Sequence, residues 1–86
     1  MLTVLVESKP RITNNEPFTA VFKINLNNSV IRAALIGSLG EAIFNNILPG
    51  DLIQIEGYFL TPNAFIITET IMSFEAAIGR NLNAYV

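Results

Sequence analysis

The side chains of this chain that could do chemistry are few, and their types exclude most catalytic mechanisms. The 86 residues include no histidine and no cysteine, so no Ser-His or Cys-His nucleophile can form. A zinc site would have to use carboxylates alone, and these are scattered without a D-x-D or E-x-x-E cluster. The acidic residues are Glu7, Glu16, Glu41, Asp51, Glu56, Glu69 and Glu75. We expect no enzymatic activity, no metal site and no cofactor.

The basic residues indicate a different chemistry, the binding of phosphate groups. Lys23 and Arg32 are predicted to be cross-strand neighbours on the outward face of a hairpin. Like charges placed directly opposite each other lower the stability of a strand pair by up to about 1 kcal/mol unless an anion lies between them. A phosphate would fit in that place. Lys9 and Arg11 lie in a polar loop before the hairpin. The alternative for all four is an ordinary surface position, with charged heads in water and aliphatic stems over apolar neighbours.

Two aromatic residues offer flat surfaces on which nucleobases can stack. Tyr58 lies on the polar face of one predicted strand, and Phe65 begins the next strand. Stacking of a base on an aromatic ring is worth about 1–3 kcal/mol. Phe65 has a competing role as a core residue, and Tyr58 as an ordinary surface residue. The candidate nucleic-acid-binding residues are therefore Lys9, Arg11, Lys23, Arg32, Tyr58 and Phe65.

The element that must position the central basic pair is a hairpin. From residue 18 to 26 every even-numbered residue is apolar, which is the period of two of a strand with one buried face. Asn27-Asn28 suits a two-residue turn, because asparagine tolerates positive φ. The turn predicts these opposite pairs: Leu26 with Ser29, Ile24 with Ile31, Lys23 with Arg32, Phe22 with Ala33, and Ala20 with Leu35. The second strand then turns only apolar residues inward.

Further elements flank this hairpin. Residues 2–7 are a β-rich run and predict a first strand, followed by a polar loop over residues 8–17 with a turn at Asn14-Asn15. Extended backbone around Arg11-Ile12-Thr13 within this loop is the alternative. After Gly37, Ser38 and Glu41 match a capping box, which predicts a short helix to about residue 46.

Two more strands are predicted at residues 52–60 and 65–72. In the first of them Ile53, Ile55 and Phe59 share one face, and Gly57 allows a bend or bulge. The whole order is three strands, a helix and two strands, which is the layout of the five-stranded OB barrel. We therefore predict an all-β OB-fold domain over residues 1–74, with residues 75–86 as a C-terminal tail or arm. A generic α+β meander is the alternative.

Three segments resemble the single-stranded DNA-binding protein (SSB) family, which includes primosomal replication protein N and short SSB-like proteins of cyanobacteria and plastids. Ile31-Arg32-Ala33-Ala34-Leu35-Ile36-Gly37-Ser38-Leu39-Gly40-Glu41 is similar to the third strand and helix start of that family. Residues 48–57 are similar to its fourth strand, and residues 11–16 are similar to the turn that leads into its second strand. The resemblance spans roughly residues 2–73 and implies an OB fold that binds single-stranded DNA or RNA in replication. At the stacking positions of the family this chain carries Val30, Ile36 and Ala64.

The composition predicts self-association. Hydrophobic residues make up 51% of the chain and charged residues 14%. A chain of this size buries only roughly 60–65% of its unfolded surface when it folds alone, so apolar side chains remain outside. A homo-oligomer, either a dimer or a tetramer, would cover them, whereas a monomer with apolar surface residues is the alternative. The expected oligomer contacts are the outward apolar residues Val21, Val30, Ala34 and Ile36.

The net charge of −2 argues against strong, sequence-blind binding to nucleic acid. Two functions therefore stay open: a weakly binding, oligomeric single-strand-binding module, and a protein-interaction or assembly module that has lost nucleic-acid binding. No apolar run reaches the ~18 residues of a membrane helix, and we expect no membrane partner. The first residues lack a basic leader and a cleavage site, which predicts a cytoplasmic or plastid-stroma location.

Overall fold

The computed structural model describes residues 1–72, which are mostly β structure. The elements are β1 (Leu2–Val6), β2 (Arg11–Asn15), β3 (Phe18–Leu26), β4 (Ser29–Ile36), α1 (Ser38–Ile43), a 3₁₀ turn (Phe44–Asn46), β5 (Leu52–Thr61) and β6 (Ala64–Met72). The predicted tail at residues 75–86 lies outside the described residues. No helix within residues 1–72 has the length and apolar character needed to cross a membrane.

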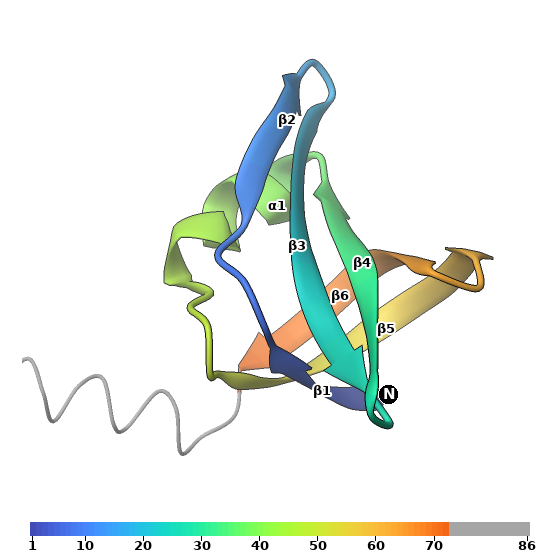
Figure 1. The fold of residues 1–86 in the computed structure, drawn as a ribbon. Coiled ribbons are helices and arrows are strands. Elements are labelled where there is room, and N and C mark those ends of the chain that lie inside the picture. The colour runs from blue at the N-terminus through green and yellow to red at the C-terminus, as the bar shows by residue number, and fades with distance from the viewer. Residues whose placement is uncertain (73–86) are drawn as a thin grey trace, which may run out of the picture.

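Five of the strands close into a barrel (Figure 1). The sheet runs in the order β1-β5-β6-β4-β3-β2, and β1 also pairs with β3, which joins the two ends of the five-stranded part. All pairings are antiparallel except β4 with β6, which is parallel. The helix α1 lies between β4 and β5 in the chain and packs against β3 and β4. The predicted OB-like barrel is confirmed, and its closure excludes the open α+β meander.

The hairpin of β3 and β4 has the predicted register. Lys23 pairs with Arg32, and the other four predicted pairs are also present. Asn27 and Asn28 form the turn with φ values of 51° and 67°, the left-handed conformation that a tight hairpin turn requires. Because strand side chains alternate between faces, this register turns one set of residues inward and leaves the basic pair outside.

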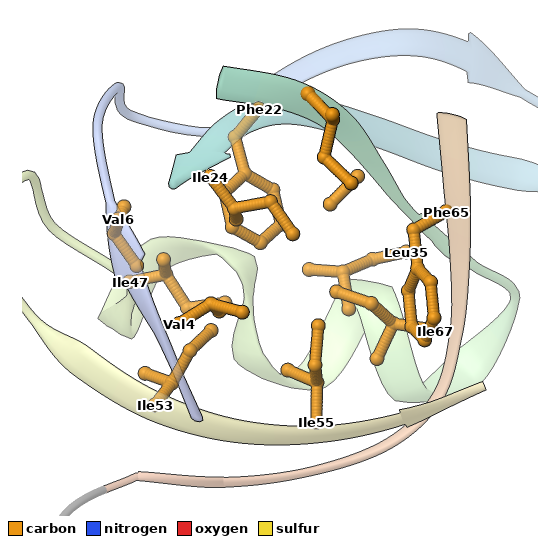
Figure 2. Packing of buried hydrophobic residues seen from close by; sticks show 12 residues of the cluster. Val4, Val6, Phe22, Ile24, Leu35, Ile47, Ile53, Ile55, Phe65 and Ile67 are labelled. Atoms are coloured by element: carbon orange, nitrogen blue, oxygen red, sulfur yellow. The ribbon is translucent and has the colours of Figure 1, made fainter. Parts of the chain in front are cut away.

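The barrel interior is filled by apolar side chains from all five strands and from the connection after α1 (Figure 2). Figure 2 shows side chains from opposite walls pointing into one shared space. Fully burying each Val, Ile, Leu or Phe contributes roughly 1.5–3 kcal/mol. The buried cluster consists of Val4, Val6, Phe22, Ile24, Ile31, Ala33, Leu35, Ile47, Ile53, Ile55, Phe65 and Ile67.

The alternative of extended backbone at residues 11–13 is the one present before β3, and it belongs to a strand, β2, that continues to residue 15. Arg11 pairs with Val21 and Asn15 with Phe18, so β2 lies along the first half of β3. The turn lies at residues 16–17, not at the predicted Asn14-Asn15. The physical reason is the length of β3. Along the edge of β3 that pairs with β1, β1 reaches only the second half of β3. The backbone groups of the first half of β3 need another partner on that edge, and β2 supplies it.

The predicted capping box at the start of α1 is wrong. Gly37 occupies the N-cap position with φ 78°, and no side chain caps the helix. Ser38 is already helical, and the Glu41 amide donates to the Gly37 carbonyl oxygen at 3.1 Å. The positive φ of Gly37 turns the chain directly from β4 into the helix, so the cap lies one residue earlier than the sequence pattern predicted. The extent of the helical segment, to residue 46, agrees with the prediction.

Phe59 lies on the predicted face of the fourth barrel strand, because it pairs with the buried Phe65 as Gly57 pairs with the buried Ile67. Ile53 and Ile55 are buried, but Phe59 is 52% exposed. The register between β5 and β6 shifts between Glu56 and Gly57 and shifts again after Phe59. The alternation of β5 from Ile53 to Phe59 continues through the first shift, but the end of the hairpin extends beyond the barrel (Figure 1), which leaves Phe59 exposed.

Gly57 at the first register shift tests this description of β5. A Cβ at residue 57 would lie 1.8 Å from the Ile66 carbonyl oxygen, a backbone atom that cannot move aside alone. We expect Gly57→Ala to lower the free energy of unfolding by about 1–3 kcal/mol, measured by urea denaturation. Gln54→Ala, an exposed change on the same strand, should stay within about 0.5 kcal/mol of the wild type. Equal stabilities for the two variants would contradict the close approach at Gly57.

Candidate nucleic-acid interface

Four basic side chains gather around one groove on the outside of the barrel. Lys23 comes from β3, Arg32 from β4, Arg11 from β2, and Lys9 from the β1–β2 connection. The groove has a volume of about 570 Å³. Its other lining residues are Ser8, Thr13, Val21 and Phe22. The structure therefore brings together all four basic residues that the sequence singled out.

The central pair is held in place through its backbone. The Lys23 amide donates to the Ser8 hydroxyl at 2.8 Å, and the Lys23 carbonyl accepts from the Glu7 amide at 2.8 Å. The Arg32 amide donates to the Asn63 carbonyl at 2.9 Å. Both side chains leave exposed strand positions directly opposite each other. The two charges are thus fixed at their points of attachment while their long side chains stay free to reach an anion.

One row of outward residues crosses the sheet beside this pair. Arg11 pairs with Val21, Val21 with Ala34, Ala34 with Ile66, and Ile66 with Tyr58. Four interstrand spacings of about 4.8 Å make this row roughly 19 Å long. A guanidinium lies at one end, an exposed phenol ring at the other, and apolar side chains between them. Such a row can contact the apolar faces of bases, with phosphates at its charged side.

A second groove continues from the first across β4. It has a volume of about 460 Å³ and shares Lys23 and Arg32 with the first groove. The other lining residues are Val30, Ile31, Thr61, Asn63 and Ala64. The basic pair therefore lies between two grooves, one on the β2 side and one on the side of the β5–β6 hairpin, and borders both.

Charge is unevenly distributed over the molecule. Among the residues that the structure describes, no aspartate or glutamate lines either of these grooves. All four lysines and arginines of residues 1–72 line the first groove. The negative net charge is therefore a poor guide to this face, where the local charge is positive.

The two aromatic candidates have different positions. Tyr58 is 55% exposed, on the same row as Arg11, so its ring has a free face. Phe65 is only 3% exposed and belongs to the core, which was the competing role that the sequence left open. Phe65 contacts Phe59 edge-on, with ring centroids 5.0 Å apart. The exposure of Phe59 could not be predicted from the strand pattern, because it depends on how far the β5–β6 hairpin extends beyond the barrel.

The residues predicted as oligomer contacts share the outer face with the basic residues. Val21 lines the first groove and Val30 the second. Ala34 pairs with Val21, and Ile36 pairs with Thr19 at the outer end of β4. Val30 and Ile36 are 55% and 41% exposed. The apolar residues and the basic residues are therefore interleaved on one surface and do not form two separate sites.

Comparison of this chain with known protein families, curated proteins and solved structures finds no match. Within residues 1–72 no three aspartate, glutamate, histidine or cysteine side chains gather in a position to hold a metal ion. The grooves on the outer face of β3 and β4 combine basic side chains with apolar and hydroxyl groups.

The basic pair itself can be tested through its effect on stability. If Lys23 and Arg32 repel each other across the strands, Lys23→Gln should raise the free energy of unfolding by up to about 0.5 kcal/mol in low salt. The gain should vanish near 1 M NaCl, where the screening length is about 3 Å. Urea denaturation at both salt concentrations measures it, with Lys9→Gln as the control that lies in a loop. A loss of stability in Lys23→Gln at both concentrations would contradict the repulsion.

Proposed function

We propose that this barrel binds single-stranded nucleic acid, with single-stranded DNA as the first partner, across the outer face of β3 and β4. The observation that carries the proposal is the groove in which Lys9, Arg11, Lys23 and Arg32 surround apolar and hydroxyl side chains with no carboxylate among them. A ligand for this surface needs a repeated negative charge and flat apolar groups, and a single strand has both.

Each part of the surface has a role in this proposal. Lys23 and Arg32 hold a phosphate between them, which relieves their mutual repulsion. Arg11 and Lys9 bind neighbouring phosphates on the β2 side. Tyr58 stacks on one base at the other end of the row, and the small and aliphatic residues between them contact base faces more weakly. With four cations, the slope of log K against log [salt] is at most about −3, from roughly −0.7 for each phosphate.

Binding by one chain is expected to be weak, which is why we propose an oligomer. When a strand is bound to one groove of an oligomer, the other grooves are held close to it, and this high effective concentration strengthens the overall binding. The resemblance to the SSB family supports the same reading, including a role in DNA replication in the cytoplasm or the plastid stroma. The tight Asn27-Asn28 turn and the aliphatic Val30 and Ile36 make this a reduced version of such a module.

A second candidate function is a protein-interaction or assembly barrel. The observation that favours it is the exposure of Val30 and Ile36, at positions where the resemblance implies stacking aromatics. Aliphatic side chains there suit an apolar protein surface better than a base. A binding measurement separates the two candidates.

We expect labelled oligo-dT to bind with a dissociation constant below about 10 μM in low salt, and more weakly as salt is raised, in a fluorescence-anisotropy titration. The double variant Lys23→Ser/Arg32→Ser should weaken binding at least tenfold, because it removes the phosphate site at the centre of both grooves. No anisotropy change at about 100 μM protein in low salt would abandon nucleic-acid binding and leave the assembly barrel.

The control for this double variant is Thr3→Glu/Gln54→Glu. Thr3 and Gln54 are also an exposed cross-strand pair, on β1 and β5, and line neither groove. The two double variants make the net charge more negative by the same amount. If the control weakens binding as much as the Lys23→Ser/Arg32→Ser variant does, only the overall charge matters and the proposed site is wrong.

Tyr58 is tested separately. Loss of a stacking ring costs about 1–3 kcal/mol, so Tyr58→Ser should weaken binding of oligo-dT by about fivefold or more. Tyr58→Phe keeps the ring and should bind as the wild type does. The same anisotropy titration measures both variants. Equal affinity of the serine and phenylalanine variants would show that the ring takes no part.

A further inference from the structure

Within residues 1–72 the positive charge of the outer face is concentrated on one side of the sheet. Lys9 in the β1–β2 connection and Arg11 in β2 line the first groove but not the second. β2 is the last strand in the order of the sheet and pairs only with β3 (Figure 1). The row of outward residues that leads from Tyr58 to Arg11 therefore ends at an edge of the sheet, beside the groove that holds all four cations.

The other end of the row has no positive charge. Residues 57–68, which include Tyr58 and Ile66, have no charged side chain. The charged residues that border this stretch are Glu56 and Glu69, which are exposed and pair with each other across β5 and β6. Carboxylates at this place repel phosphate groups, whereas the cations at the other end attract them. A strand interior, with one charge at every phosphate, does not match such a one-sided surface.

The cations of the first groove are close enough to act on one anion. Lys23 lies directly opposite Arg32, and Arg11 pairs with Val21, two residues from Lys23. These steps correspond to Cα separations of about 5 Å across a strand pair and about 7 Å along a strand. No carboxylate lines the groove, so its positive charge is not neutralised there by the protein itself. The groove therefore favours an anion with more than one charge on a single group.

A hydroxyl group adds a directed hydrogen-bond donor to these cations. Ser8 lines the first groove, and its oxygen accepts a hydrogen bond from the Lys23 amide at 2.8 Å. This bond fixes the position of the oxygen, and no residue within 1–72 accepts a hydrogen bond from the Ser8 hydroxyl. Its proton is therefore available to an oxygen atom of a bound anion.

We propose that the first groove binds the terminal phosphate monoester of a single strand, so that the barrel holds an end of the strand and not its middle. The inference rests on the proposed single-strand binding and adds a preference to that same site. A phosphate monoester carries about −1.5 to −2 charge at pH 7 and has three acceptor oxygens, whereas each phosphate within a strand carries one charge. The nucleotides that follow the end lie over the apolar part of the row, toward Tyr58.

The proposal also requires that the strand crosses the row in one direction. A strand has two different ends, and only one of them lies in the first groove when the bases lie over the row in a single arrangement. A phosphate at that end should strengthen binding, and a phosphate at the opposite end would lie near Tyr58, where the surface offers no cation. Strands phosphorylated at the 5′ end or at the 3′ end have the same composition and charge, so they control for charge alone.

Competition for the labelled oligo-dT of the anisotropy titration tests this preference in low-salt buffer without phosphate. The competitors are unlabelled thymidine strands of about four nucleotides, close to the smallest site size of such barrels. One has a 5′-phosphate, one has a 3′-phosphate, and one has neither. One of the two phosphorylated strands should bind about tenfold more tightly than the other, because its monoester accepts charge-assisted hydrogen bonds in the first groove.

The double variant Lys9→Gln/Arg11→Gln removes the two cations that line the first groove only. Both side chains are exposed, so the fold should be retained. The difference between the two phosphorylated strands should fall to about twofold or less in this variant. Thr3→Glu/Gln54→Glu changes the net charge by the same amount outside both grooves and should keep the full difference.

Equal affinity of the two phosphorylated strands, or an undiminished difference in Lys9→Gln/Arg11→Gln, would overturn the end preference and leave the proposed single-strand binding in place. Inorganic phosphate alone, as a further competitor, distinguishes a free anion from a strand end. It should not displace the labelled strand at concentrations at which the phosphorylated strand does, and equal competition would assign the groove to free phosphate. Failure of the labelled oligo-dT itself to bind would remove both the proposed function and this preference.

Discussion

The antiparallel pairing of β3 with β4 is the constraint on which the rest of the structure depends. Its register over Asn27-Asn28 decides which side chains enter the barrel and which remain outside. A slip by one residue would exchange the two faces, so that Lys23 would replace Phe22 or Ile24 in the core. The cost of burying an unpaired charge is several kcal/mol, which makes the observed register strongly favoured. The same register fixes the basic pair at the centre of the outer face.

Core packing and the candidate site are therefore two results of one alternating pattern. The inward residues of β3 and β4 pack against β1, β5 and β6, which makes the wall rigid. The outward residues of the same strands carry the charges and the apolar row. The Lys23 amide donates to the Ser8 hydroxyl and the Arg32 amide to the Asn63 carbonyl, which holds the β1–β2 connection and the β5–β6 hairpin against this wall. The two basic grooves are formed where the β1–β2 connection and the β5–β6 hairpin border the outer face of β3 and β4.

The sequence predicted the parts of the structure that depend on local pattern. The period of two in β3, and asparagines that accept positive φ, were sufficient for the hairpin and its register. Of β2 only extended backbone at residues 11–13 was predicted, as an alternative, because its residues are polar and exposed, and the full strand is explained by the unpaired half of β3. Phe59 lies on the predicted face of β5, but its exposure was not predicted, because the distance that the hairpin extends beyond the barrel depends on the other strands, which no single segment encodes. Lys9 and Arg11 lie beside the basic pair because of the path that the chain takes between β1 and β3, which the local pattern does not determine.

The central claim is that the outer face of β3 and β4 binds single strands, and a residue-resolved NMR titration of the ¹⁵N-labelled chain with oligo-dT tests it most directly. The account predicts that amide shifts concentrate at Arg11, Lys23, Arg32 and Tyr58 and at their cross-strand neighbours. The amides of α1 and of the Thr3–Gln54 pair should remain unperturbed. Shifts concentrated at α1 or at β1, or no shifts with oligo-dT in excess, would contradict the account.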